Sequence, residues 1–372
     1  MPIKHHPGLD HLRAIAIILV FFFHYAGIFG HPEWMEQGFA FGWTGVDLFF
    51  VLSGFLISSQ LFATIIAGKR ISFPVFFIKR FFRIVPAYVV IVVLYFLVPS
   101  FREREGLAPL WRYLSFTQNI GLDLRVHGTF SHAWSLCIEE QFYLLLPPLL
   151  LLLVRIKKLS TGWMLLVLLF IGGLIIRWLT WERLDTSNDA FAIDWYQWIY
   201  YPTWCRLDGL VTGVAISAAW QFRPLLQQWM RRNGNYFLTG GFVLLAIAWY
   251  CCGEQYSLLA STAGFPLVAL GYGCLLVAAI NPNSFLSRPS IITSTIARLS
   301  YAIYLSHKMI IHITQEQLER FNIDPAGTAM LCCCIATCFA GALLLNILVE
   351  KPFLQLRARL IRKEFRVSTD IF

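Results

Sequence analysis

Ionisable side chains recur inside long apolar stretches of this 372-residue sequence. His24 follows the apolar run 14–23, and Glu139 and Glu140 interrupt the apolar stretch 132–154. Charges within a bilayer are costly, so each of these residues marks a candidate functional site. An imidazole that titrates near neutrality can take a proton from a hydroxyl, and a carboxylate can orient that imidazole. We therefore predict His24 as a general base and Glu139 as its supporting carboxylate.

The segment around Glu139 has helical spacing. Ser135, Glu139 and Tyr143 are four residues apart, which puts a hydroxyl, a carboxylate and a phenol on one helix face. Glu140 points about 100° away from that face. This pattern favours a catalytic surface, and a polar clamp between two helices is the alternative interpretation.

Further polar residues fall at similar depth, toward the outer half of the predicted helices. Lipid-facing positions for so many ionisable groups would be prohibitive, so we expect them to surround a polar cavity. Tyr304 and His307 share a helix face, where they either contact the substrate or acyl group or hold helices together. The expected cavity residues beyond the helix 132–154 are Asp47, Arg206, Asp208, Tyr304 and His307.

A second group of charges lies at the opposite, inner end of the predicted helices. Arg80 and Arg83 are three residues apart, so both guanidinium groups can point the same way and bind phosphates. Basic residues are also expected at this end from membrane orientation alone. Asp10 and Arg13 can pair at the inner end of the first helix, and we assign them to the same inner site.

The amino-acid composition indicates which type of secondary structure positions these groups. Hydrophobic residues make up 58% of the chain and charged residues 14%, a balance that a soluble domain would have to expose as large apolar patches. Continuous apolar runs indicate helices and exclude an alternating barrel pattern. We predict an all-α polytopic membrane protein with about ten transmembrane helices, at about 10–30, 43–67, 84–100, 132–154, 161–181, 199–221, 235–253, 258–280, 297–317 and 326–349.

The distribution of basic residues predicts the orientation of the chain in the membrane. Basic residues concentrate in alternate short loops and at the C-terminal end, which predicts that both termini are cytoplasmic. The net charge of +9 is explained by this orientation and does not indicate nucleic-acid binding. We expect a membrane domain over 1–351, a basic cytoplasmic tail over 352–372, and a solvated outer loop at 102–105. The nine cysteines lack metal-ligand spacing and are interpreted as small buried hydrophobes, so no metal is expected.

These motifs together resemble the integral-membrane acyltransferase family 3, typified by bacterial polysaccharide O-acetylases. The similar blocks run in family order over nearly the whole chain and are 9–13 leading to His24, 45–55, 80–83, 134–143, 206–209, 301–307 and 350–352. Some members carry an additional extracytoplasmic hydrolase-like domain, which we expect to be absent here. Ser306 stands where many members have an aromatic residue.

The resemblance implies a reaction. An acyl group, usually acetyl, passes from cytoplasmic acyl-CoA to a hydroxyl of an extracytoplasmic glycan, such as a lipopolysaccharide or exopolysaccharide sugar, or of a small molecule. It implies that Arg80 and Arg83 bind the phosphates of coenzyme A, that His24 is the base, and that the enzyme lies in the bacterial inner membrane. Ser53 and Gly54 would allow close backbone approach beside the pantetheine arm, although small-residue packing explains them equally well. Direct transfer and an acyl-enzyme are both compatible with the sequence.

A proton-coupled secondary transporter is the alternative function. It would also have about ten spans with buried His and Glu residues. Transporters often contain inverted repeats or helices broken at corresponding positions of two halves, and neither pattern is visible here. The ordered motifs therefore favour the enzyme.

Overall fold

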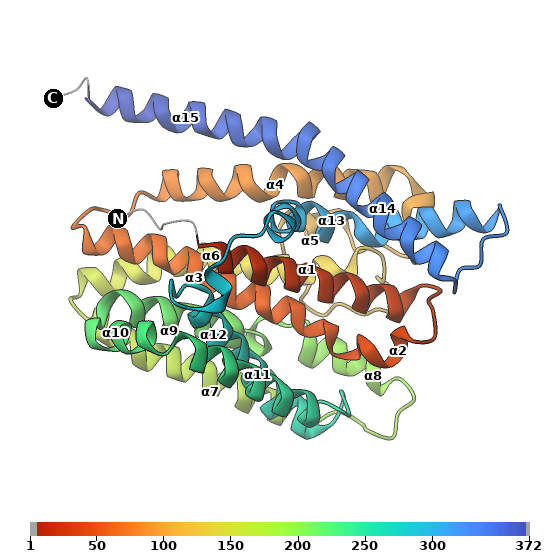
Figure 1. Cartoon of the computed structure of the whole chain (residues 1–372), viewed down its shortest axis with the longest axis horizontal. Helices are drawn as coiled ribbons and strands as arrows, with labels where there is room; N and C mark the ends of the chain where they lie inside the picture. The colour runs from red at the N-terminus through yellow and green to blue at the C-terminus, as the bar shows by residue number, and fades with distance from the viewer. Residues whose placement is uncertain (1–5, 370–372) are drawn as a thin grey trace. The chain divides into compact units, whose positions relative to one another are not determined.

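The computed structural model describes residues 6–369, and every regular element within them is a helix (Figure 1). Eight segments of this described part are long and apolar enough to cross a membrane. The predicted all-α polytopic architecture is therefore confirmed, while the count of ten spans and the cytoplasmic location of both termini stay predictions. The eight segments contain α1 (Pro7–Ile28), α3 (Gly45–Ile66), α4 (Phe73–Leu97), α6 (Trp134–Arg155), α7 (Gly162–Trp181), α11 (Gly234–Cys251), α12 (Phe265–Ala279) and α14 (Thr328–Leu345).

Two expected spans lie outside these eight segments. In the region 199–221, the chain makes a π-helical turn and a 3₁₀ turn before α9 (Asp208–Phe222), which has 15 residues. Such a helix is about 22 Å long, shorter than the ~30 Å hydrocarbon layer. The other, α13 (Ile291–Glu319), has 29 residues, but polar and ionisable side chains such as Lys308 lower its hydropathy.

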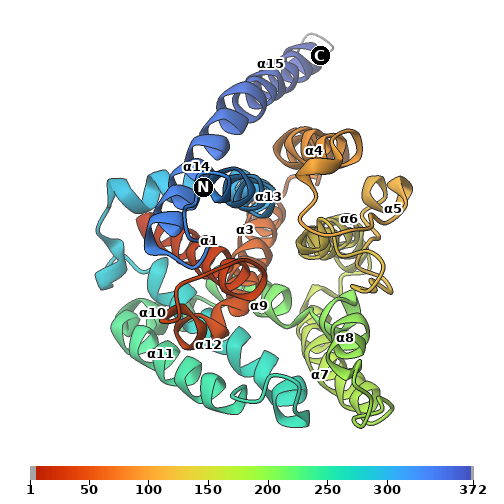
Figure 2. The ribbon, with the colours of Figure 1, turned by 90° about the vertical axis from the view of Figure 1, so that its right-hand side faces the viewer.

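The described chain divides into two compact units. Unit 1 comprises residues 6–23, 37–69 and 104–298. Its centre is formed by α3, α9 and α12, which all pack against one another, and α11 packs against α12. The short α10 (Pro224–Arg232) packs against α9. Unit 1 also contains α6 and α7, both labelled in Figure 2. Four of the predicted site residues, Ser135, Glu139, Glu140 and Tyr143, lie on α6.

Glycines allow α3 and α9 to pack closely. A Cβ atom on Gly54 would lie 2.1 Å from the carbonyl oxygen of Leu210, and one on Gly213 would lie 2.2 Å from that of Val51. Both distances are far shorter than a van der Waals contact, so neither position accepts a larger side chain at this helix spacing. Small-residue packing of α3 against α9 therefore accounts for Gly54.

The change Gly54→Ala is expected to destabilise the protein by about 1–3 kcal/mol, because the added carbon must push α3 away from α9. Thermal unfolding of the purified protein in detergent should show a lower midpoint. Gly172→Ala on α7 is the matched control, since a Cβ there meets nothing within 4 Å, and its midpoint should stay the same or rise slightly. Equal midpoints for the two variants would contradict this explanation of the helix contact.

Unit 2 comprises residues 24–36, 70–103 and 299–369. Within it, α4 packs against the π-helical turn η9 (Asn346–Glu350) and against α15 (Lys351–Thr369), which continues from that turn. The last turn of α1, the greater part of α13 and all of α14 also belong to this unit. The predicted tail 352–372 corresponds to α15, and its last three residues lie outside the described part of the chain.

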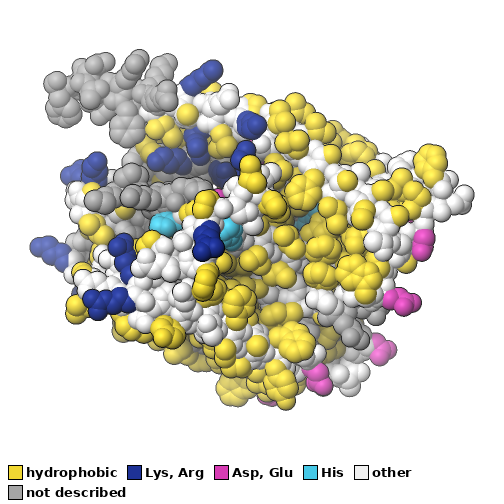
Figure 3. Space-filling model, in the orientation of Figure 1, with side chains coloured by type: hydrophobic (Ala, Val, Ile, Leu, Met, Phe, Trp, Pro, Cys, Tyr) yellow, Lys and Arg dark blue, Asp and Glu magenta, His cyan; other side chains and the backbone are white. Residues whose placement is uncertain are grey.

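The surface is suited to lipid. Hydrophobic side chains cover much of the face in Figure 3. On α7, Met164, Val167, Leu168 and Ile171 are each about half exposed or more. A continuous row of exposed aliphatic side chains would be unfavourable in water but is stable against hydrocarbon chains. Together with the eight apolar segments, it identifies an integral membrane protein.

Candidate active site

Two histidines contact one another in unit 2. His24 lies near the C-terminal end of α1, and His307 lies in the middle of α13. The Nδ1 atom of His24 is 2.9 Å from the Nε2 atom of His307, and the ring centroids are 5.0 Å apart. His307 is completely buried, whereas His24 is half-buried. The structure therefore gives the predicted base a ring partner that the sequence analysis assigned to the cavity without connecting it to His24.

The backbone of α13 holds His307 in turn. Its Nδ1 atom is 3.0 Å from the carbonyl oxygen of Ile303 and 2.9 Å from that of Tyr304. The Tyr304 ring lies beside the imidazole, with centroids 6.2 Å apart, which confirms that the two residues share a face. His307 is thus fixed by its own helix on one side and contacts His24 on the other.

A buried ion pair follows directly after His307. Lys308 Nζ lies 3.4 Å from an oxygen of Glu103, and their side chains are 2% and 0% exposed. The expectation of a solvated loop at 102–105 is wrong for this part of it. Glu103 is buried because a lysine within α13 needs a counter-charge, and Arg102 donates to the carbonyl oxygens of Tyr95 and Phe96 at the end of α4.

Polar contacts also fix the chain just after His24. The side-chain amide of Gln315 on α13 donates to the hydroxyl of Tyr25, at 3.2 Å, and to the carbonyl oxygen of Gly30, at 2.9 Å. Both Tyr25 and Gln315 are buried. The end of α1 is therefore anchored to α13 immediately after the histidine pair, which limits the motion of His24.

The predicted phosphate-binding arginines lie on α4 in unit 2. Arg80 and Arg83 are both half-buried and one helical turn apart. Arg83 interacts electrostatically with Glu350 at the end of η9 and with Arg357 on α15. Glu350 also accepts a hydrogen bond of 2.8 Å from Asn346. The structure therefore brings Arg83 close to Glu350 and also to Arg357, which was expected only as part of the basic tail.

The other residues assigned to the inner site lie at the start of α1, in unit 1. Asp10 is in the first turn of the helix, and Arg13 follows one turn later. Both side chains are half-buried. An acidic residue in the first turn also interacts favourably with the helix dipole. Their assignment to the donor site stays a prediction.

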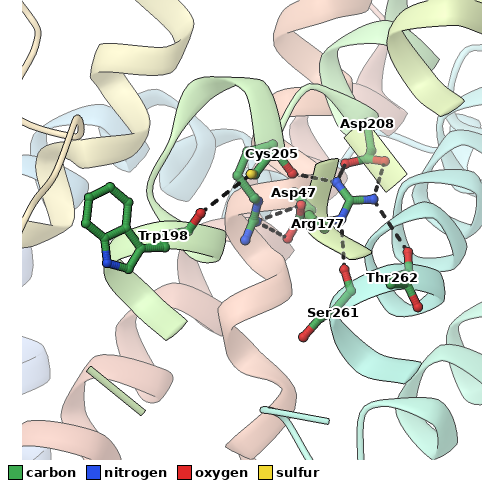
Figure 4. A network of polar contacts seen from close by, with 8 residues as sticks. Asp47, Arg177, Trp198, Cys205, Asp208, Ser261 and Thr262 are labelled. Atoms are coloured by element: carbon green, nitrogen blue, oxygen red, sulfur yellow. Dashed lines mark hydrogen bonds and ion pairs between the residues drawn. The ribbon is translucent and has the colours of Figure 1, made fainter. Parts of the chain in front are cut away.

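Two ion pairs are buried within unit 1. Arg177 on α7 contacts both carboxylate oxygens of Asp208, at 2.7 and 3.0 Å. Its other hydrogen bonds go to the carbonyl oxygens of Cys205, Ser261 and Thr262 (Figure 4). The last two carbonyls belong to a π-helical turn, Ala260–Gly264, which directs them toward the guanidinium. The donors of Arg177 and the carboxylate of Asp208 are therefore satisfied within the protein.

The second pair joins Arg206 to Asp47. Nη2 of Arg206 lies 2.8 and 2.9 Å from the two oxygens of Asp47. Among the described residues, its Nε and Nη1 atoms have no hydrogen-bond partner. The guanidinium carbon instead lies 4.3 Å from the ring centroids of Tyr200 and Phe265 and 5.2 Å from that of Trp134. This aromatic cage stabilises the cation. The ion pair of Asp47 and Arg206 links α3 to the segment just before α9.

The face of α6 predicted from the sequence is also in unit 1. Tyr143 donates a hydrogen bond of 2.8 Å to Glu139, as the four-residue spacing indicated. Ser135 is buried, and Glu139 and Glu140 are half-buried. Glu139 and His24 belong to different units, so the support of His24 by Glu139 stays a prediction.

Sequence reasoning missed a polar network around Gln141. The Gln141 amide donates to the carbonyl oxygen of Phe116 at 2.8 Å and to Asn119 Oδ1 at 3.1 Å, and it accepts from Thr203. Asn119 is buried and donates to Tyr201 and Thr203. The network joins α6 to two loops. A glutamine directly after two glutamates in an apolar helix was the available signal.

Metal binding finds no support in residues 6–369. No group of three or more His, Cys, Asp or Glu side chains there is arranged to hold a metal ion. The site instead offers imidazoles, carboxylates, guanidinium groups and hydroxyls. These groups can move protons and bind anions.

Comparison with known proteins shows which family this sequence resembles. A family model described as an acyltransferase domain matches residues 6–346. Peptidoglycan O-acetyltransferase OatA of Listeria monocytogenes is 29% identical over 338 residues, covering 85% of this chain and 51% of the relative. O-acetyltransferase OatA of Staphylococcus aureus is 29% identical over 327 residues, covering 82% and 50%.

The chain thus spans about half the length of these curated relatives. No solved structure was found to match it significantly. The family match includes α1 with His24, α4 with both arginines, α6, and α13 with His307. Because that match extends over nearly all of the described helices, the chain belongs to the membrane acyltransferase 3 family.

Proposed function

We propose that the protein is an O-acetyltransferase of the bacterial inner membrane. It moves an acetyl group from cytoplasmic acetyl-CoA to a hydroxyl of an extracytoplasmic glycan. The acyltransferase match over residues 6–346 carries this proposal. The names of the relatives in Listeria and Staphylococcus favour peptidoglycan as the glycan, over the lipopolysaccharide or exopolysaccharide suggested by the family resemblance alone.

The chemistry requires one proton transfer and one acyl transfer. The acceptor hydroxyl gives its proton to His24 as its oxygen attacks the thioester carbonyl. The bond from the carbonyl carbon to sulfur then breaks, the new ester forms, and the thiolate leaves and takes up a proton. A half-buried imidazole suits this task, because it is reachable by substrate and yet shielded from bulk water.

The donor is a polyanion, and the positive charges on α4 suit it. Guanidinium groups on Arg80 and Arg83 can hold phosphates through paired hydrogen bonds. Arg357, which interacts electrostatically with Arg83, adds a third positive charge to this cluster. Glu350 beside Arg83 orients the guanidinium before the donor arrives.

The direct test uses the purified chain in detergent with acetyl-CoA labelled on the acetyl group. Soluble peptidoglycan fragments and de-O-acylated lipopolysaccharide are supplied as separate acceptors. Release of thiol with label on one glycan supports the proposal and identifies the acceptor class. A folded protein that neither binds nor turns over acetyl-CoA would contradict it and would direct attention to transport assays.

Replacing both Arg80 and Arg83 by alanine should raise the KM for acetyl-CoA by about 10²- to 10⁴-fold, since charge-assisted hydrogen bonds are worth roughly 1.5–3 kcal/mol each. The rate at saturating donor should change much less, because these groups bind donor and transition state alike. Arg70→Ala is the matched control, because Arg70 is an exposed arginine that precedes the same helix. An equal rise in KM for the control would show that general surface charge, and not this pair, attracts the donor.

A further inference from the structure

The hydrogen bonds of His307 determine the tautomer of His24. Nδ1 of His307 lies within hydrogen-bond distance of the carbonyl oxygens of Ile303 and Tyr304, at 3.0 and 2.9 Å. A carbonyl oxygen accepts hydrogen bonds and never donates, so Nδ1 of His307 must carry a proton. In the neutral ring, the other nitrogen, Nε2, then has a lone pair and must accept.

The accepting Nε2 atom of His307 determines which ring nitrogen of His24 carries the proton. Nε2 of His307 lies 2.9 Å from Nδ1 of His24, so Nδ1 of His24 must donate. A neutral His24 that donates from Nδ1 has its lone pair on Nε2. The chain of bonds from the backbone of α13 through His307 thus makes Nε2 the basic nitrogen of His24.

The opposite arrangement requires a positively charged His307. A doubly protonated ring would donate from Nε2 as well, and Nδ1 of His24 would then have to accept. Such a charge would be fully buried and adjacent to the cationic Lys308. Glu103 is already engaged by the Lys308 ammonium at 3.4 Å. Burial and like charge both oppose a second cation at this position.

We propose that His307 is a positioning residue, which holds His24 in the Nδ1–H tautomer and presents Nε2 to the substrate hydroxyl. This role rests on the proposed function of His24 as the base. It is the role that a carboxylate has in a serine protease triad, and the sequence analysis had given it to Glu139. A neutral imidazole orients the base here without adding a negative charge inside the membrane.

Replacing His307 by glutamine or by asparagine distinguishes a positioning role of its Nε2 atom from a role in packing alone. Glutamine is nearly as long as histidine and can place an acceptor oxygen near the position of Nε2. Asparagine is shorter and can replace only the nitrogen nearer the backbone. We expect His307→Gln to retain the turnover rate within about 10-fold, and His307→Asn to lose about 100-fold or more, with little change in donor KM.

The control is His312→Gln on the same helix, because His312 is partly exposed and lies beside Glu316, with 3.9 Å between their nitrogen and oxygen atoms. It should leave turnover unchanged. Equal activity of His307→Gln and His307→Asn, in proteins that both elute as single folded species, would overturn the positioning role. Loss of activity in His307→Gln as severe as in His24→Ala would overturn it too.

A spectroscopic test does not depend on catalysis. Histidine labelled with ¹⁵N gives distinct signals for protonated and unprotonated ring nitrogens, and the His24 signals are those missing in His24→Ala. We expect an unprotonated Nε2 for His24 in the wild type and a mixture of tautomers in His307→Asn. An unprotonated Nδ1 in the wild type would refute the inference. If instead His24→Ala keeps full transfer activity, the proposed base is wrong, whichever tautomer the spectrum shows.

Discussion

Replacing His24 by alanine is expected to lower the rate of acetyl transfer by roughly 10²–10⁴-fold, the usual contribution of a positioned general base. The acceptor hydroxyl would then have to lose its proton to water or to a poorly placed group. The Arg80 and Arg83 cluster is untouched by the change, so the affinity for acetyl-CoA should stay within a few-fold of the wild-type value. Rates of thiol release at saturating donor and acceptor measure the effect.

The control for this change is His31→Ala. His31 lies in the loop after α1 and contacts the carbonyl oxygen of Pro32, so its loss removes a nearby histidine without touching the pair. It should leave the transfer rate within a few-fold of wild type. Near-native transfer by His24→Ala would refute the assignment of the base. A fall in rate accompanied by loss of donor binding would instead indicate that the change had damaged the fold of unit 2.

The depth of a residue along its helix could be predicted from the sequence. The neighbouring helix that its side chain contacts could not. The distance of His24 and His307 from the ends of their apolar segments followed from hydropathy. Which helix lies opposite each one depends on packing between segments more than 280 residues apart. From the sequence alone, His24 is therefore expected to lie beside a carboxylate, and His307 is expected only to line the cavity.

Contacts between residues of one helix could be predicted, because helix geometry sets which side chains share a face. The spacing of Glu139 and Tyr143 fixes their relation through helix geometry alone, and the hydrogen bond between them is present. Glu103 shows the opposite case. Its neighbours in sequence are all charged, a pattern typical of a solvated loop, and only the fold reveals that Lys308 lies beside it. A lysine within an apolar helix is itself a signal that a counter-charge must be found.

Asp47, Arg206 and Asp208 were predicted as cavity residues, and the geometry of their buried ion pairs gives an expectation for stability. Arg177→Met is expected to destabilise the protein by about 3–5 kcal/mol, because it leaves the buried Asp208 carboxylate without a counter-charge. The thermal midpoint in detergent should fall sharply. Arg125→Met is the matched control, since Arg125 pairs with Asp123 while 44% exposed, and exposed ion pairs contribute little to stability.

The double change Arg177→Met and Asp208→Leu separates charge burial from hydrogen bonding. Removing both charges abolishes the isolated carboxylate, so the midpoint should rise above that of the single variant. It should remain below wild type, because the carbonyl oxygens of Cys205, Ser261 and Thr262 lose their donor. A single variant with a wild-type midpoint and no activity would instead assign Arg177 and Asp208 to substrate contact, since a structural pair cannot be broken without loss of stability.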